Sequence, residues 1–148
     1  MSENNKFLFN KSIEIGKKRE KIVIRFLEPH VDHIEENDDF RWDILIKKGN
    51  KEITIEVKFN SMFLKTGNFA VEFECRGKPS GINTTKSNYW VFVDSNDKIY
   101  CIKTEKLREL CKVSKIKPAF CEDGVNNNYL VKESLFKPHQ IELLSILD

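Results

Sequence analysis

The sequence predicts an α/β (α+β) fold, and three features of the chain support this prediction. An amphipathic helix is expected over about residues 12–27. Two β-rich runs flank the turn dipeptide Gly49-Asn50. Short strands and helix-forming segments follow in the second half of the chain. The order of elements is therefore one helix, several strands, and then a mixed α and β region.

Length and composition are typical of one globular domain. The 148 residues are 40% hydrophobic and 32% charged. No apolar run approaches the roughly 20 residues of a membrane span. We expect a single domain over residues 1–148, with a core over about 12–103 and a C-terminal α/β extension over about 104–148. Because residues 1–10 show no signal-peptide core, we expect a cytoplasmic protein.

The predicted first helix carries a carboxylate on its apolar side. It ends before Pro29, whose ring disfavours helical geometry at the preceding residue. Glu20 falls within the apolar stripe and should therefore point toward the core. The stripe consists of Ile13, Gly16, Val23 and Leu27.

The next unit is a predicted β-hairpin with a two-residue turn at Gly49-Asn50. In that register Lys48 pairs with Lys51, and counting outward places Asp43 opposite Glu56. Facing residues share one side of a sheet, with Cβ atoms within about 5.5 Å. Two carboxylates so close together repel each other and favour a cation between them.

Lys58 shares the Glu56 face of its strand, because side chains two positions apart point the same way. The opposite face is apolar and consists of Ile53, Ile55, Val57 and Phe59. The remaining predicted elements are strands over Phe69–Cys75, Tyr89–Asp94, Ile99–Lys103 and Tyr129–Val131, a turn at Gly77–Gly81, a helix over Glu105–Val113 with Thr104 as its N-cap, and a closing helix over Pro138–Leu147.

This arrangement of acids and lysine suits metal-assisted phosphoryl chemistry. Mg²⁺ binds one or two carboxylates together with waters and phosphate oxygens. A lysine nearby can orient or deprotonate the nucleophile, or neutralise the developing charge. Glu20 could reach the same site as an outer-sphere ligand. The alternative is that Asp43, Glu56 and Lys58 form the solvated face of an amphipathic hairpin, with a weak surface ion pair.

At these residues the sequence resembles the PD-(D/E)XK nuclease superfamily. Its signature is an acid on one strand and an acid-x-lysine triplet on the next, with a preceding-helix glutamate in many members. Trp42 replaces the proline of the name, as in many active members. The triplet alone is common by chance, and the strand context makes it informative. The matching segments are Gly16-Lys-Lys-Arg-Glu20, Phe40-Arg-Trp-Asp43, Ile55-Glu56-Val57-Lys58, Gly77-Lys-Pro-Ser-Gly81 and Asn88-Tyr-Trp-Val-Phe-Val93.

The resemblance implies a restriction-endonuclease-like core, in which helices flank a central mixed β-sheet. It implies that Asp43, Glu56 and the Val57 carbonyl hold Mg²⁺, with Mn²⁺ as a substitute, and that Lys58 assists the attacking water. Glu20 corresponds to the helix glutamate. The later segments are similar to small bacteriophage-encoded members, and Holliday-junction resolvases share this size and layout. The resemblance therefore implies a DNA substrate and a phage origin.

Two parts of the chain are candidates for nucleic-acid binding. Residues 11–25 hold six Lys/Arg against two Glu, including Lys17 and Lys18, although a charge run is also typical of a solvated helix face. The turn and its continuation hold many hydrogen-bond donors, although a plain tight turn would look similar. These donors are Lys78, Ser80, Asn83, Thr84, Thr85 and Lys86. Glu72 and Glu74 share one strand face and are interpreted as exposed edge residues, although one could join the metal.

The leading hypothesis is a Mg²⁺-dependent endonuclease that hydrolyses DNA phosphodiester bonds. The alternatives are a catalytically inactive nucleic-acid-binding module of the same fold and an RNA-directed nuclease. Symmetric cutting of both strands would favour a homodimer.

Overall fold

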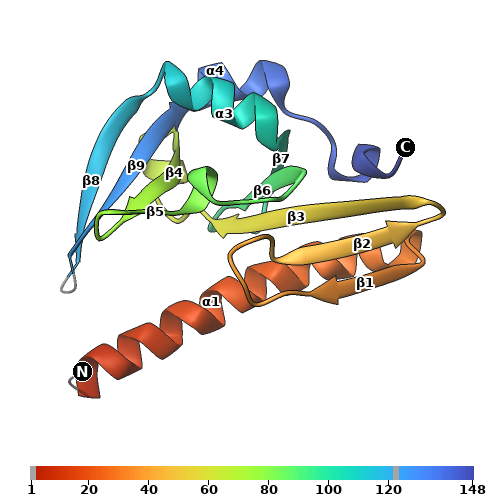
Figure 1. The fold of residues 1–148 in the computed structure, drawn as a ribbon, viewed down its shortest axis with the longest axis horizontal. Helices are drawn as coiled ribbons and strands as arrows, with labels where there is room; N and C mark the ends of the chain where they lie inside the picture. Colours follow the sequence, from red (N-terminus) through yellow and green to blue (C-terminus); the bar gives the residue numbers. More distant parts are fainter. Residues whose placement is uncertain (1–2, 122–123) are drawn as a thin grey trace.

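The computed structural model describes the backbone of residues 3–121 and 124–148, and the side chains of residues 14, 16–120 and 124–148. A five-stranded sheet with the order β1-β2-β3-β6-β7 forms its centre (Figure 1). The sheet is mixed, because β3 and β6 are parallel and the other neighbours are antiparallel. Its strands are β1 (His33–Glu36), β2 (Ile44–Lys48), β3 (Lys51–Phe59), β6 (Tyr89–Val93) and β7 (Ile99–Lys103). The predicted α/β fold with a central mixed sheet is confirmed.

A second sheet, with the order β5-β4-β9-β8, is formed by the crossover between β3 and β6 together with the C-terminal part of the chain. All of its neighbours are antiparallel. The C-terminal hairpin thus pairs with β4 and is part of the same sheet as the crossover. The strands are β4 (Asn68–Cys75), β5 (Lys78–Pro79), β8 (Lys115–Cys121) and β9 (Gly124–Lys132).

Helices flank the central sheet. The first of them runs longer than the sequence pattern predicted, and its N-terminal part extends past strands β1 and β2 of the central sheet in Figure 1. The helices are α1 (Glu3–Leu27), α2 (Phe63–Thr66), α3 (Thr104–Lys112) and α4 (Glu133–Phe136), with 3-10 turns at Glu28–His30, Gly81–Asn83, Lys137–His139 and Leu143–Leu147. The prediction of Thr104 as the N-cap of this helix was wrong, because α3 already begins at Thr104 and Lys103 is its N-cap. The Thr104 hydroxyl lies 3.3 Å from the Ser87 hydroxyl.

The central sheet buries apolar side chains on both faces, which explains the nearly continuous apolar run of β6. Alternate residues of a strand point to opposite faces. Val91 and Val93 belong to the core cluster that contains Val23 and Leu27 of α1. Trp90 and Phe92 belong to the second cluster, which packs under the other sheet, α3 and α4. The Ile13 side chain of the predicted helix stripe lies outside the described residues.

Further parts of the fold differ from the predicted elements, and β5 lies where only a turn was predicted. The closing helix over Pro138–Leu147 was wrong, because this segment forms two short 3-10 turns with Pro138 in the first turn of one. The strands β1 and β8 were not predicted. Both carry charged residues, and β8 also contains Pro118, which is tolerated at a sheet edge. Their strand character comes from pairing and not from an apolar pattern.

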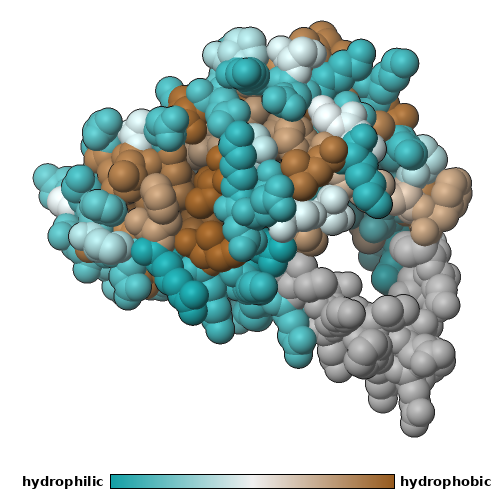
Figure 2. Space-filling model, turned by 180° about the vertical axis from the view of Figure 1, so that it is seen from behind, coloured by the Kyte–Doolittle hydropathy of each residue, from teal (hydrophilic) through white to brown (hydrophobic). Residues whose placement is uncertain are grey.

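Figure 2 shows the molecule from behind, with hydrophobic residues gathered in patches among hydrophilic ones. Among the helices the structure describes, none is long and apolar enough to cross a membrane. The large apolar residues that remain exposed include Phe40, at 65% of its full area. Phe40 lies in the loop before β2 and borders the site described below.

Candidate active site

The hairpin that carries the predicted site has the predicted turn and register. Lys48 pairs with Lys51, and the ladder continues to the pair of Ile44 and Ile55. Gly49 has a φ of 58°, as a two-residue hairpin turn with glycine at its first central position requires. The register is therefore confirmed up to the residue next to Asp43.

Asp43 itself leaves the ladder and binds its neighbour strand through its side chain. In a continued ladder the Val57 N–H would reach the Trp42 carbonyl. Instead the Val57 N–H donates to Asp43 Oδ2 at 2.8 Å. The Trp42 carbonyl accepts from Asn37 Nδ2 at 3.0 Å, and the Asp43 N–H donates to the carbonyl of Ile55 at 3.0 Å. One carboxylate oxygen of Asp43 thus serves as a backbone acceptor, which fixes the side chain beside β3.

Glu56 and Lys58 lie on the same face of β3, as predicted. Lys58 Nζ is 3.2 Å from Glu56 Oε1. It also lies 5.7 Å from the ring centre of Trp90, a fully buried residue that pairs with Glu56 across β3 and β6. Glu56 retains only 8% of its exposed area, so its carboxylate has little contact with solvent. The two side chains form an ion pair over an aromatic floor.

Glu20 is held near this pair by its neighbour in α1. Arg19 is buried, its guanidinium stacks on the Phe59 ring at 4.2 Å from the ring centre, and its Nε lies 3.5 Å from Asp97 Oδ1. This contact anchors α1 on the end of β3. Glu20 follows directly and is close enough to feel the negative charge of Asp43. The predicted helix glutamate is thus on the site side of α1.

The carboxylates of the site are poorly stabilised as anions. Burial, opposed by the charge of Lys58 and assisted by that of Asp43, raises the pKa of Glu56 to about 7. Burial also raises the pKa of Asp43. Burial, with Asp43 next in effect, raises the pKa of Glu20 to about 7. Three neighbouring acids with raised pKa values indicate a place where added positive charge would be favourable.

Lys58 responds to the same surroundings in the opposite sense. Burial alone lowers the pKa of an ammonium group. Here the attraction of Glu56 and Asp43, with a further contribution from Glu72, outweighs burial, and the pKa of Lys58 is raised. The side chain is therefore a stable cation beside the two acids.

A cleft of about 420 Å³ opens over the ion pair. Its floor comes from β3, and its opposite wall comes from the segment that follows β5. The lining residues are Phe40, Glu56, Lys58, Pro79, Ser80, Gly81 and Thr84. The cleft brings part of the predicted nucleic-acid-binding segment next to the predicted acid and lysine.

The other predicted nucleic-acid contacts have different surroundings. Lys17 Nζ lies 3.4 Å from Asp38 Oδ1, and Lys18 is exposed. Lys78, Asn83 and Lys86 are exposed, although the Asn83 amide donates to the Phe73 carbonyl at 3.1 Å.

Thr85 is only 4% exposed and does not line the cleft. Its hydroxyl lies 3.3 Å from the Arg41 carbonyl and 2.9 Å from the Ser87 hydroxyl. Its surroundings support a structural role.

The donor set fits a divalent ion that keeps part of its shell free. Within the described part of the chain, no three His, Cys, Asp or Glu side chains converge as a metal site. Asp43 and Glu56 supply two carboxylates, and Mg²⁺ is commonly bound by one or two carboxylates plus waters and phosphate oxygens. The raised pKa values of both acids are the effect that such a cation would relieve.

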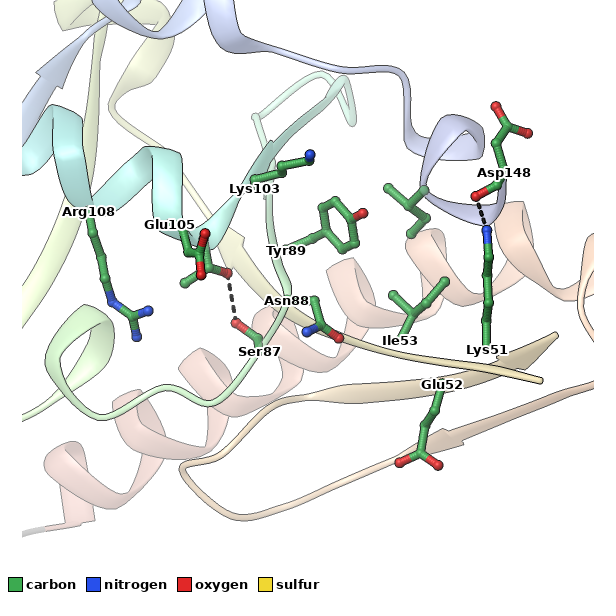
Figure 3. A pocket seen from close by; sticks show the side chains of 12 residues that line it. Lys51, Glu52, Ile53, Ser87, Asn88, Tyr89, Lys103, Glu105, Arg108 and Asp148 are labelled. Carbon is green, nitrogen blue, oxygen red and sulfur yellow. Dashed lines mark hydrogen bonds between the residues drawn. The ribbon is translucent and has the colours of Figure 1, made fainter. Parts of the chain in front are cut away.

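A second depression, of about 430 Å³, lies at the start of β3 (Figure 3). Lys51 Nζ donates to the backbone carbonyl of Asp148, and the Ser87 and Thr104 hydroxyls lie 3.3 Å apart. Its polar groups thus hold the surrounding segments to one another. This depression does not contain the predicted site residues.

Sequence reasoning missed two residues that contact the lining of the cleft. Trp90 was assigned to the core without its contact to Lys58. Glu72 was interpreted as an exposed edge residue, whereas it is half-buried in β4, between β5 and β9, and accepts a hydrogen bond from Ser80. The sequence indicated that Glu72 shares a strand face with Glu74. It did not indicate that Glu72 lies near Lys58.

Comparison with known proteins identifies the fold and not a family. No family model matches the chain, and no curated protein matches it by sequence. The structure is similar to that of Hjc, a Holliday junction resolvase from the archaeal hyperthermophile Archaeoglobus fulgidus, with a TM-score of 0.54 and 12% identity over 89% of this chain and 94% of that chain. The predicted restriction-endonuclease-like core is thus confirmed as a fold.

Proposed function

We propose that the protein is a metal-dependent endonuclease that hydrolyses DNA phosphodiester bonds. The observation that carries the proposal is the pairing of Glu56 with Lys58 on the floor of one cleft, next to the carboxylate of Asp43, which accepts from the Val57 N–H between them. Glu20 lies close enough to this group to feel the charge of Asp43. The fold supports it, because the similar structure is that of a DNA resolvase. Function depends on the site and not on the fold, so the side-chain geometry carries more weight.

Each site residue has a role that its surroundings allow. Asp43, Glu56 and the Val57 carbonyl would hold Mg²⁺, or Mn²⁺ in its place. The bound ion would lower the pKa of a water molecule and stabilise negative charge on the phosphate. Lys58, a stable cation on the same face, would neutralise the charge that develops on the phosphate oxygens. Glu20 would orient the nucleophilic water from the helix side.

The DNA strand would lie along the cleft and the basic residues around it. Ser80 and Thr84 line the wall that faces Lys58. Exposed side chains of α1 and of the segment that forms the wall would contact the phosphate backbone, which positions a strand without reading its sequence. These side chains are Lys17, Lys18, Lys78, Asn83 and Lys86.

Branched DNA is the first substrate class to test, because the similar protein is described as a Holliday junction resolvase. The experiment is a cleavage panel of four-way junction, plasmid, linear duplex, single-stranded DNA and RNA, with Mg²⁺ and with Mn²⁺. We expect cleavage of at least one DNA substrate, its loss with a chelator, and a fall of at least about 100-fold in Lys58→Ala. Glu52→Gln is the control, because Glu52 is exposed and lies on β3 away from the cleft.

Two outcomes would contradict this proposal. If the wild type cuts no member of the panel with either metal, the protein is not a nuclease of this kind. If the wild type binds DNA without metal and does not cleave it, and Asp43→Asn binds DNA equally well, the protein is a binding module of the same fold. Cleavage restricted to RNA would keep the chemistry and change the substrate. Light scattering on the junction complex tests whether paired cuts come from a homodimer.

A further inference from the structure

Glu72 lies behind the wall of the cleft and is hydrogen-bonded to it. It lies on β4, in the second sheet, and Ser80 Oγ donates a hydrogen bond to its Oε2 at 2.9 Å. Ser80 lines the cleft together with Glu56 and Lys58. The Glu72 side chain thus reaches the wall opposite the catalytic floor, and its charge acts on Lys58.

A β-bulge in β4 provides the second connection to this wall. The pairing of β4 with β9 shifts register between Glu72 and Glu74, which leaves Phe73 without a partner in the ladder. The Phe73 carbonyl instead accepts from the Ser80 N–H at 3.0 Å and from the Asn83 amide at 3.1 Å. Bulges next to active sites commonly redirect backbone and side chains in this way.

Gly81 allows the wall to lie directly against β4. Its φ is +51°, and a Cβ built at this position would lie 2.1 Å from the Glu72 carbonyl oxygen. Real Cβ atoms do not approach so closely, so an alanine here would displace backbone. Gly77 has a φ of +79° and nothing within 4 Å of such a Cβ. Gly77 and Gly81 therefore share a left-handed backbone conformation, but only Gly81 lies against the backbone of Glu72.

We propose that Glu72 is a positioning residue of the nuclease: through Ser80 it holds the turn over residues 80–84 as the wall that places the DNA strand against Glu56 and Lys58. This inference rests on the proposed function. It assigns Glu72 no contact with the reacting atoms. A strand held by a displaced wall would still bind through the surrounding lysines, but it would sit out of line with the floor of the cleft. Small displacements of this kind lower the chemical step more than binding.

The first test is a set of variants in steady-state cleavage kinetics with multiple turnovers. Glu72→Ala and Ser80→Ala should each lower kcat by about tenfold or more while KM changes less than about twofold. The double variant should be no worse than the poorer single variant, because both remove one hydrogen bond. Glu72→Gln should restore most of the rate, since its amide oxygen can accept the Ser80 hydroxyl.

Two matched controls separate this role from general damage. Glu74→Ala removes the next carboxylate on the same strand, which accepts from Asn127 Nδ2 at 2.8 Å and does not line the cleft, and it should keep the wild-type rate. Gly81→Ala should lower kcat more than Gly77→Ala, since both acquire an unfavourable φ and only the first meets the Glu72 carbonyl.

Hydrogen exchange without DNA or metal supplies a readout that does not need activity. The amides of Ser80, Asn83 and Thr84 donate within the wall and to β4, and they should exchange faster in Glu72→Ala but not in Glu74→Ala. Unchanged exchange in Glu72→Ala would overturn the proposal. If the wild type is active, faster exchange in Glu72→Ala together with an unchanged kcat would also overturn the proposal. An inactive wild type would refute the proposed function and any catalytic role of the wall, while the exchange result would still decide whether Glu72 holds the turn.

Discussion

At the scale of single residues, Glu56 has to carry a negative charge where the surroundings disfavour it. It is 8% exposed, with the Asp43 carboxylate nearby and Lys58 Nζ 3.2 Å away. Burial, more than Asp43, raises the pKa of Glu56 to about 7. Acids with strongly raised pKa values are common in active sites. Ionisation of such an acid lowers the stability of the folded state.

The raised pKa of Glu56 predicts how stability depends on pH. The folded state favours the protonated acid, so its contribution is present at low pH and is lost as the pH rises from about 4.5 to about 7. Urea unfolding in a chelator should therefore show a lower free energy of unfolding at pH 8 than at pH 5. Glu56→Gln should reduce this difference, by up to about 3 kcal/mol. An identical pH dependence in Glu56→Gln would contradict the buried, destabilised anion.

Residue-scale reasoning from the sequence reached Asp43, Glu56 and Lys58 because a two-residue turn fixes the register and the register fixes the face. It did not reach the side-chain bond from Val57 to Asp43, which depends on where the ladder ends. Nor did it reach Glu72, because the contact with Ser80 requires a bulge and a crossover that no local pattern reveals. A phage origin stays a prediction.

At the scale of elements, the β2–β3 turn positions the site by setting the register of the hairpin. Gly49 has a φ of 58°, and a Cβ at this position would meet no atom within 4 Å. Gly49→Ala should therefore lower the free energy of unfolding by about 1 kcal/mol through backbone strain alone. Gly16 lies inside α1 and also has open space, so Gly16→Ala should raise it by about 1 kcal/mol. Thermal denaturation of the two variants should give shifts of opposite sign; shifts of the same sign would contradict these backbone conformations.

Strand β5 and the segment after it are expected to contact DNA. Lys78→Ala and Lys86→Ala should each weaken DNA binding and reduce the slope of log K against log salt by about 1, because each would remove one phosphate contact. The cleavage rate at saturating DNA should change little, since neither residue lines the cleft. Lys48→Ala, at the hairpin turn, is the control. Equal salt slopes in all three variants would exclude this segment as a phosphate-binding surface.

Strongly patterned elements were predicted and irregular ones were not. The apolar run of β6 and the alternation in β3 indicated strands because burial on one or both faces shaped their composition. The charged strand β8 and the 3-10 turns near the C-terminus owe their conformations to pairing and packing. Local propensity is overridden in such segments.

At the scale of the whole molecule, the fold brings together groups that are distant in sequence. The helix α1 covers one face of the central sheet and supplies Glu20, and the crossover between β3 and β6 builds the wall that carries Ser80. The parallel pairing of β3 with β6 places Trp90 beneath Lys58. The similarity to the resolvase structure spans nearly the whole of both chains, so it concerns this arrangement as a unit.

The most direct test of the central claim is the single-turnover cleavage rate of one DNA substrate with Mg²⁺, measured for the wild type, Asp43→Asn and Glu52→Gln. Asp43 and Glu52 are both acids of the hairpin, and only the first is expected to hold the ion. We predict a fall of at least about 100-fold in Asp43→Asn and an unchanged rate in Glu52→Gln. A wild type that does not cleave, or an Asp43→Asn variant as fast as the wild type, would contradict the account.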